Sequence, residues 1–284
     1  MAYQKFEFSG AIGEEHRDFF NKYGFVHFTN FLSSRQVQDI LSSVEKVEAD
    51  WLQANIQLVN GTPVKYGKDE NGNTIIHRFS FLNQYSPIVN NLVSDRSFEN
   101  LKAPLQDPDN ARIGLDEKDG VVFNHYINTS GSNFLEMGWH TDGARDIFYG
   151  LRIQPMLNVG VYLDDSPKTK GGLRVLPGSH KQGLWKLLFR KRYFLDHNTD
   201  DNEVAIEAKA GDLVIHHGSI WHRVAASSFV GSESRRRVMY TPIVTGKYIP
   251  KDSASKTPFY HRFGNLVGRR KNPLEIPSPE RWIL

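Results

Sequence analysis

From about residue 120 onward the chain is a succession of short apolar or alternating segments, separated by turn-forming Gly, Pro, Asn, Asp and Ser. The segments read VVFNHYIN, MLNVGVYL, LRVLP, EVAIEA, DLVIHHG, IWHRVAA and RRVMYTPIV. Short strands with frequent turns are typical of a β-sandwich or a β-barrel. The sequence therefore predicts a mainly β fold with flanking helices, built around a jelly-roll core.

The first part of the chain mixes helical and strand patterns. Ser33 or Ser34 can cap a helix whose apolar residues follow helical spacing. These apolar residues are Val37, Ile40, Leu41, Val44, Val47 and Trp51. Further along, Asn71-Gly72 lies between two possible strands and predicts a hairpin.

We expect a single domain over residues 1–284, because no internal repeat, low-complexity tract or linker divides the chain. Its N-terminal portion of helices and strands covers about residues 1–118, and the jelly-roll core covers about residues 119–245. Residues 246–284 are rich in Pro, Lys, Arg and Ser and are predicted to form a surface tail.

Composition narrows the classes of function. The net charge of +3 is small for 284 residues, so it does not indicate a nucleic-acid partner. Because the chain has no cysteine, any metal site must use His, Asp, Glu or backbone oxygen. No signal peptide and no apolar run long enough to cross a membrane is visible, so we expect a cytoplasmic protein without a membrane partner.

The stretch GWHTDG places His140 and Asp142 two residues apart. In a β-strand, residues at this spacing point to the same face, and an imidazole and a carboxylate aimed at one point suit a divalent metal. The pair would suit a solvated strand edge equally well, so the motif alone is weak.

Two later features strengthen the metal hypothesis. The segment GDLVIHHGSIWHRV offers His222, which a jelly roll can bring beside the His140/Asp142 pair. Two imidazoles and one carboxylate form the facial triad of non-haem Fe(II) oxygenases, which leaves positions open for a co-substrate and O₂. The three arginines of SRRRVMYTPI lie at the start of a predicted strand. A guanidinium inside a barrel needs an anionic partner, such as a dicarboxylate co-substrate.

The motifs WHTDG, LDDSPKTKGGLRVLPGSH, GDLVIHHGSIWHRV and RRRVMYTPI occur in an order that resembles the phytanoyl-CoA dioxygenase family of Fe(II)/2-oxoglutarate-dependent oxygenases. The resemblance implies a double-stranded β-helix, the jelly-roll variant of that family. It also implies that His140, Asp142 and His222 bind iron. The arginine that binds 2-oxoglutarate then falls within Arg235–Arg237; we choose Arg236, with Arg235 as the alternative.

What the resemblance implies is a dioxygenase that uses Fe(II), 2-oxoglutarate and O₂, and releases succinate and CO₂. It would hydroxylate or otherwise oxidise a small molecule, whose identity and the protein's oligomeric state the sequence leaves open. Asp142 stands where halogenating relatives have a small residue, which favours hydroxylation. The alternative is a jelly-roll metal-binding protein or a non-oxidative metalloenzyme, such as a cupin-like isomerase or hydrolase, which would not need the strand arginine.

Residues around these motifs are candidates for the rest of the site. Asn128 is a candidate for binding the co-substrate, and the substrate-pocket candidates are Trp139, Arg145 and Tyr149. Strand alternation turns His216 and His217 to opposite faces, and His217 is the one considered as a neighbour of the iron. The segment KLLFRKRYF, residues 186–194, is either a solvated helix face or a lid.

Overall fold

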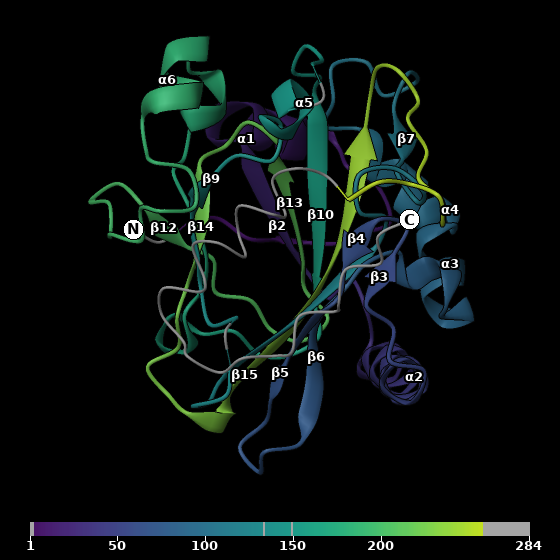
Figure 1. Ribbon diagram of the computed structural model, residues 1–284. Coiled ribbons are helices and arrows are strands. Elements are labelled where there is room, and N and C mark those ends of the chain that lie inside the picture. The colour runs from purple at the N-terminus through teal and green to yellow at the C-terminus, as the bar shows by residue number, and fades with distance from the viewer. Residues whose placement is uncertain (1–2, 133, 149, 258–284) are drawn as a thin grey trace.

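The computed structural model describes residues 3–132, 134–148 and 150–257 of the chain. Two β-sheets enclose one core between them, and helices α2, α3 and α4 lie together on one side of the larger sheet (Figure 1). The fold is therefore mainly β with flanking helices, as the pattern of short strands predicts.

The larger sheet has nine strands in the order β1-β2-β13-β10-β15-β8-β6-β5, with β7 paired to β15. Every pair is antiparallel except β1 with β2. The strands are β1 (Phe6–Glu7), β2 (Phe25–Thr29), β5 (Lys65–Lys68), β6 (Thr74–Phe79), β7 (Arg112–Ile113), β8 (Val122–Asn128), β10 (Met156–Tyr162), β13 (Leu213–His217) and β15 (Gly231–Val244).

The smaller sheet has four strands in the order β12-β11-β14-β9, all paired antiparallel. They are β9 (Met137–His140), β11 (Gly172–Val175), β12 (Val204–Ala205) and β14 (His222–Ala225). Strands far apart in the chain thus become neighbours, as a jelly roll requires. A separate two-stranded pair consists of β3 (Leu58–Val59) and β4 (Thr62–Pro63).

Six α-helices and four short 3₁₀ turns connect the strands within the described residues. The α-helices are α1 (Glu14–Tyr23), α2 (Ser34–Gln53), α3 (Pro87–Val93), α4 (Arg96–Glu99), α5 (Arg145–Phe148) and α6 (Leu184–Phe189). The 3₁₀ turns are η1 (Leu82–Gln84), η2 (Asn100–Lys102), η3 (Lys168–Lys170) and η4 (Ser179–Lys181). None of the helices in the described ranges is long and apolar enough to cross a membrane.

Strand alternation divides the apolar residues of the larger sheet between two cores. On β15, Met239 and Ile243 point outward and pack with helices α1 to α4, whereas Val238 points into the space between the sheets. The same division holds for β13, where Ile215 joins the outer core and Val214 the inner one. Polar residues on the inner face therefore lie in the enclosed space between the sheets.

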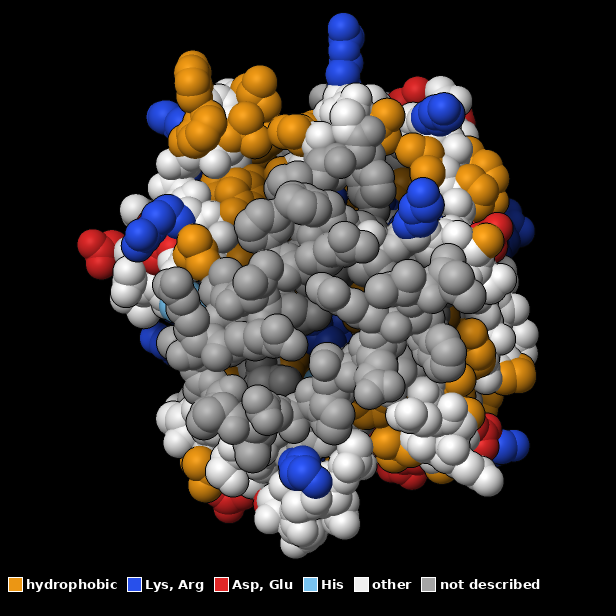
Figure 2. Space-filling model, viewed as in Figure 1, with side chains coloured by type: hydrophobic (Ala, Val, Ile, Leu, Met, Phe, Trp, Pro, Cys, Tyr) orange, Lys and Arg blue, Asp and Glu red, His pale blue; other side chains and the backbone are white. Residues whose placement is uncertain are grey.

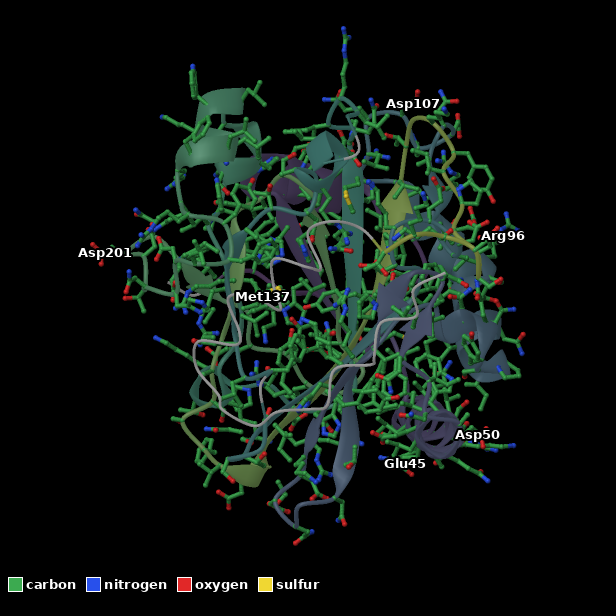
Figure 3. All side chains as sticks on the ribbon, in the orientation of Figure 1. Glu45, Asp50, Arg96, Asp107, Met137 and Asp201 are labelled. Atoms are coloured by element: carbon green, nitrogen blue, oxygen red, sulfur yellow. The ribbon has the colours of Figure 1, made fainter. Side chains whose placement is uncertain are left out.

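Helix α2 covers the outer core with the six apolar residues predicted from their spacing, all of which are buried. Its Ser33 accepts a hydrogen bond from the backbone N–H of Gln36, so Ser33 and not Ser34 is the cap. In Figure 3 Asp50 of α2 lies on the outer side of the helix, while Met137 of β9 is half-buried and packs against the core between the sheets.

The predicted portions of the chain interlock. Strands β1, β2, β5 and β6 come from residues before 119 and extend the same sheet as β10, β13 and β15. The beginning of the predicted tail also packs on the body, since Pro250 bridges to Glu117 and the backbone of Lys251 bonds to Asp116. Residues 258–284 of that tail lie outside the described part of the chain.

Candidate metal centre

The smaller sheet brings the three predicted ligands together. His140 ends β9 and His222 begins β14, where the two residues are direct cross-strand partners with ring centroids 4.1 Å apart. Asp142 follows β9, and its Oδ2 lies 3.5 Å from His222 Nε2. One possible ligand atom from each residue lies within 4.8 Å of the other two. This spacing is compact enough for all three to bind one ion.

Backbone carbonyls set the orientation of both imidazoles. His140 Nδ1 lies 2.8 Å from the carbonyl of Gly138, and His222 Nδ1 lies 3.1 Å from that of Ile220. Each Nδ1–H therefore donates, which leaves each Nε2 with a lone pair for a metal. Burial lowers the pKa of His140 and lowers that of His222 still further, so both rings stay neutral as ligands must.

Asp142 stays ionised despite its burial. Burial by itself raises the pKa of this carboxyl, but His222, His216, Arg145 and His140 together hold it well below its usual range. Asn158 Nδ2 on β10 donates to Asp142 Oδ2 at 2.5 Å. This bond fixes the orientation of the carboxylate beside the two imidazoles.

The histidine beside the triad is His216, not His217. His216 Nε2 lies 3.6 Å from Asp142 Oδ2, and its ring centroid lies 4.8 Å from that of His222. The pairing of β13 with β10 places His216 opposite Asn158, so both face the triad. His217 points the other way, toward the rings of Phe20 and His180, which corrects the earlier choice between the two.

Of the three arginines at the start of β15, Arg236 points into the space between the sheets. Its guanidinium lies 5.0 Å from the ring of Tyr126, and its Nη2 donates to the carbonyl of Ala225 at 3.2 Å. Its Nε has no hydrogen-bond partner among the described residues. Burial lowers the pKa of Arg236 to about 10, which marks a cation held at an electrostatic cost.

The two neighbouring arginines face outward. Arg237 forms a bidentate pair with Asp164, with nitrogen–oxygen distances of 2.8 and 2.7 Å. Arg235 influences the pKa of Glu48 and of Asp69, which lie away from the triad. Alternation along β15 thus separates Arg236 from both alternatives.

The residues fit a divalent metal with a dicarboxylate beside it. Two neutral imidazoles and one carboxylate are the donor set of a non-haem iron site. Gly172 of β11 lets Arg236 approach that strand closely, because it has φ +91° and a Cβ there would come within 3.2 Å of Arg236 Nη1. The guanidinium that could bind a dicarboxylate is thus held between the two sheets.

The sequence matches the model of a known family, phytanoyl-CoA dioxygenase (PhyH), over residues 20–238. The chain belongs to the phytanoyl-CoA dioxygenase family. One curated relative, the "Probable alpha-ketoglutarate-dependent hypophosphite dioxygenase" of Stutzerimonas stutzeri, is 25% identical over 173 residues. "Phytanoyl-CoA dioxygenase 1" of Oryza sativa subsp. japonica is 39% identical over 67 residues.

These sequence matches are partial. The first spans 60% of this chain and 54% of its relative, and the second spans 22% of this chain and 24% of its relative. The chain therefore aligns with about half or less of the length of the curated relatives it matches.

Solved structures share the fold over most of the chain. EctD from S. alaskensis with bound Fe has a TM-score of 0.59 and 17% identity, covering 85% of this chain and 80% of that one. The non-haem alpha-ketoglutarate-dependent carbocyclase SnoK from nogalamycin biosynthesis has a TM-score of 0.58 and 16% identity, covering 95% and 94%. EvdO2 from Micromonospora carbonacea var. aurantiaca, complexed with 2-oxoglutarate, has a TM-score of 0.57 and 16% identity, covering 89% and 97%. These neighbours confirm the predicted jelly-roll core.

Two of the other candidate residues have structural roles in this family member. Asn128 Nδ2 donates to the carbonyls of Ser227 and Phe229, at 3.3 and 2.9 Å, so its amide holds a loop. Trp139 is fully buried, and its indole N–H donates to the carbonyl of Asn198 at 2.8 Å. Roles of these two residues toward a co-substrate or a substrate stay predictions.

Arg145 remains close to the triad. It lowers the pKa of both His140 and Asp142, and its Nη1 donates to Asp119 Oδ2 at 2.9 Å. Tyr149, the remaining pocket candidate, lies outside the described residues. Arg145 is therefore the one pocket candidate that the described structure brings to the metal centre of this PhyH-family chain.

The predicted lid segment has two different halves. Helix α6 exposes Leu184, Trp185 and Phe189, and hydrophobic side chains gather in this region at the upper left of Figure 2. After the helix, the ring of Phe194 stacks on that of His140 with centroids 4.7 Å apart. Tyr193 bonds through its hydroxyl to Thr141 at 2.7 Å. The second half thus lies over His140 of the triad, as the lid interpretation expects, whereas Phe189 of the first half is exposed as on a solvated helix face.

Proposed function

We propose that this protein is an Fe(II)- and 2-oxoglutarate-dependent dioxygenase that oxidises a small molecule and releases succinate and CO₂. One arrangement carries the proposal. The buried triad of His140, Asp142 and His222 shares the space between the sheets with the inward guanidinium of Arg236, which lacks an acidic partner among the described residues. Membership of the phytanoyl-CoA dioxygenase family supports it.

We assign the residues as follows. Fe(II) binds to the Nε2 atoms of His140 and His222 and to the carboxylate of Asp142. This leaves three coordination positions open. Arg236 binds the distal carboxylate of 2-oxoglutarate, because a guanidinium binds a carboxylate strongly through paired hydrogen bonds. When bound, the iron supplies the activation of O₂ for oxidation of the substrate.

The surrounding side chains orient these groups and exclude water. Asn158 donates to Oδ2 of Asp142, so that the carboxylate keeps a single orientation, and the ring of His216 packs beside the same oxygen at 3.6 Å. The ring of Phe194 covers His140 and shields that side of the centre from solvent. Because Asp142 provides a carboxylate at the third ligand position, we propose hydroxylation or a related oxidation over halogenation.

The test is an anaerobic titration of the purified protein with Fe(II) and 2-oxoglutarate. Chelation of iron by the keto acid produces a visible metal-to-ligand charge-transfer band. We expect the band in the wild type and its loss in His140→Ala. We expect Arg236→Ala to need at least about tenfold more 2-oxoglutarate, because one charge-assisted pair is lost.

The matched control is Arg235→Ala, which removes the same charge from the outer face of the same strand. It should titrate like the wild type. Absence of a band in folded, iron-loaded wild type would remove the dioxygenase proposal. The triad would then belong to a jelly-roll metal protein without oxygenase activity, such as a Zn²⁺ or Mn²⁺ enzyme.

A further inference from the structure

A row of polar side chains crosses the inner face of the larger sheet. Lys65 of β5 is the cross-strand partner of Arg78 on β6, and Arg78 is the partner of Asn124 on β8. Asn124 in turn is opposite Val238 of β15, which belongs to the core between the sheets. Direct partners point to the same face, so this row faces the enclosed space. The row meets β15 at Val238, two residues along the strand from Arg236 and on the same face.

The buried carboxylate of Asp119 gathers cations at the same place. Its Oδ2 accepts from Arg78 Nη2 at 3.1 Å and from Arg145 Nη1 at 2.9 Å, and Lys251 Nζ lies 3.5 Å from its Oδ1. Lys65 is close enough for Asp119 to influence its pKa. Four cationic side chains thus surround one carboxylate.

The nearby acids do not offset this excess of positive charge. Glu117 is paired with Arg112 at 2.5 and 2.8 Å, and Asp146 is paired with Lys118. Lys65 Nζ lies 4.7 Å from the ring of Phe134 and has no carboxylate within ion-pair distance among the described residues. Burial, and then the charge of Arg78, lower the pKa of Lys65 to about 8. An unpaired ammonium in such surroundings is costly, and an anion would relieve the cost.

The cationic cluster borders the metal centre. Arg145 bonds through its side chain to Asp119 at 2.9 Å and through its backbone N–H to the carbonyl of Asp142 at 3.2 Å, so it links the cluster to the triad. The metal centre does not need the extra positive charge. With Fe(II), Asp142, 2-oxoglutarate and Arg236 all present, its formal charges cancel. The charge of Lys65, beside the guanidinium of Arg78 that pairs with Asp119, is therefore left for another anion.

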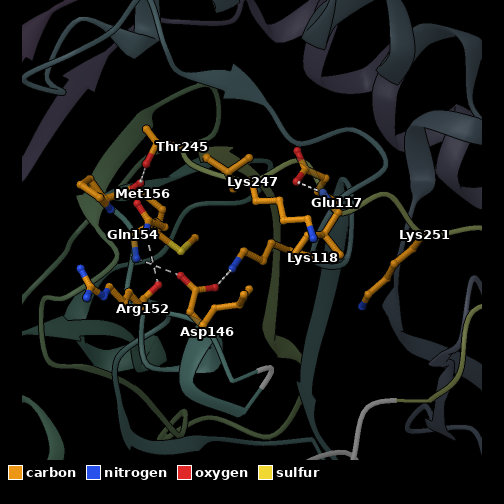
Figure 4. A pocket seen from close by; sticks show the side chains of 13 residues that line it. Glu117, Lys118, Asp146, Arg152, Gln154, Met156, Thr245, Lys247 and Lys251 are labelled. Atoms are coloured by element: carbon orange, nitrogen blue, oxygen red, sulfur yellow. Dashed lines mark hydrogen bonds and ion pairs between the residues drawn. The ribbon is translucent and has the colours of Figure 1, made fainter.

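A cavity of about 220 Å³ adjoins the cluster at Lys251 (Figure 4). Lys251 lies on its wall and contacts Asp119, while Lys118 bonds to Asp146 across it. The wall carries more cationic than acidic side chains: Lys118, Arg152, Lys247 and Lys251 against Glu117 and Asp146. Such a wall attracts anions toward the site.

We propose that the substrate of this enzyme carries an anionic group, a carboxylate or a phosphoryl-type group, and that Lys65 and Arg78 bind it beside the metal centre. The inference rests on the proposed dioxygenase function and adds the chemical class of the substrate. Arg78 provides the directional hydrogen bonds, and Lys65 provides a charge that no described carboxylate neutralises.

The experiment uses acetate and methylphosphonate as probes, each with an uncharged counterpart, acetamide or dimethyl methylphosphonate, at constant ionic strength. Each probe is titrated into the anaerobic protein saturated with Fe(II) and 2-oxoglutarate. The charge-transfer band and the midpoint of thermal unfolding are both followed. We expect the anions to perturb the band and raise the midpoint in a saturable manner, and the uncharged counterparts to do neither.

Three variants test the assignment. Lys65→Gln and Arg78→Gln should each raise the half-saturating concentration of the anion by about tenfold, because each variant loses a charge-assisted contact with the anion. The half-saturating concentration of 2-oxoglutarate should stay within about twofold of the wild type. Arg35→Gln, on the exposed face of α2, is the charge-matched control and should bind the probes like the wild type.

Equal effects of charged and uncharged probes, or wild-type binding in both Lys65→Gln and Arg78→Gln, would overturn the proposal. Lys65→Gln keeps the test decisive even if Arg78→Gln fails to fold, because Lys65 makes no ion pair with a described residue. A missing charge-transfer band counts against the dioxygenase function alone. The shift in unfolding midpoint with the same anions still decides whether the anion site exists.

Discussion

At the scale of single residues, spacing in the sequence was a better guide to the three residues of the triad than to the residues that surround them. His140 and Asp142 share a strand and its turn, so two-residue spacing was enough to suggest that they converge. The choice between His216 and His217 depends on the register of β13 against β10, and a shift of one residue exchanges their faces. Asn158 escaped notice because nothing in its own segment indicates a carboxylate opposite it.

Asn158 gives a prediction at this scale. Asn158→Ala removes the 2.5 Å hydrogen bond to Asp142 Oδ2, so the carboxylate becomes free to rotate. Loss of such a supporting bond should weaken metal binding by about tenfold or more. A titration of the metal-free protein with Mn(II), followed by the signal of the free ion, measures this. Asn128→Ala, which removes the same side chain from a loop contact, is the control and should bind Mn(II) normally.

At the scale of elements, patterns within one segment were informative and pairings between segments were not. The spacing of apolar residues predicted α2, and Asn71-Gly72 predicted the turn between β5 and β6, where Gly72 adopts φ +81°. That β6 then pairs with β8, and so brings Arg78 to Asn124, depends on residues 46 positions apart in the chain. No local signal encodes such a pairing.

The cap of α2 tests the element directly. Ser33→Ala removes the hydrogen bond that Ser33 Oγ accepts from the backbone N–H of Gln36 and should lower the free energy of unfolding by about 1 kcal/mol. Urea unfolding followed by circular dichroism measures the change. Ser34→Ala alters the adjacent serine, already inside the helix, and should leave stability within about 0.5 kcal/mol. Equal losses in both variants would contradict the assignment of Ser33 as the cap.

At the scale of the whole molecule, the net charge of +3 conceals an uneven distribution. Lys65, Arg78 and Arg236 lie on the inner face of the larger sheet, so a small net charge does not mean that positive charge is spread evenly. The single-domain organisation over residues 1–284 stays a prediction, which the continuous sheet from β1 to β15 supports. The same burial that concentrates charge also encloses several histidines.

Buried histidines predict how stability depends on pH. Burial lowers the pKa of His125 to about 3, and its Nε2 has no hydrogen-bond partner among the described residues. In the unfolded chain a histidine has a pKa of about 6.5, so between these values only the unfolded state binds the proton. Stability must therefore fall as the pH drops below about 6.5, by up to about 1.4 kcal/mol per pH unit for each such histidine.

The measurement is urea unfolding of the metal-free protein at pH 7.5, 6.0 and 5.0. His125→Gln removes one of the groups that bind a proton only on unfolding, so its stability should decline less steeply with falling pH than that of the wild type. The wild type, measured at the same three pH values, is the reference for this slope. An unchanged slope in His125→Gln would show that His125 gains its proton while the chain is still folded, and hence that water reaches the face of β8 on which it lies.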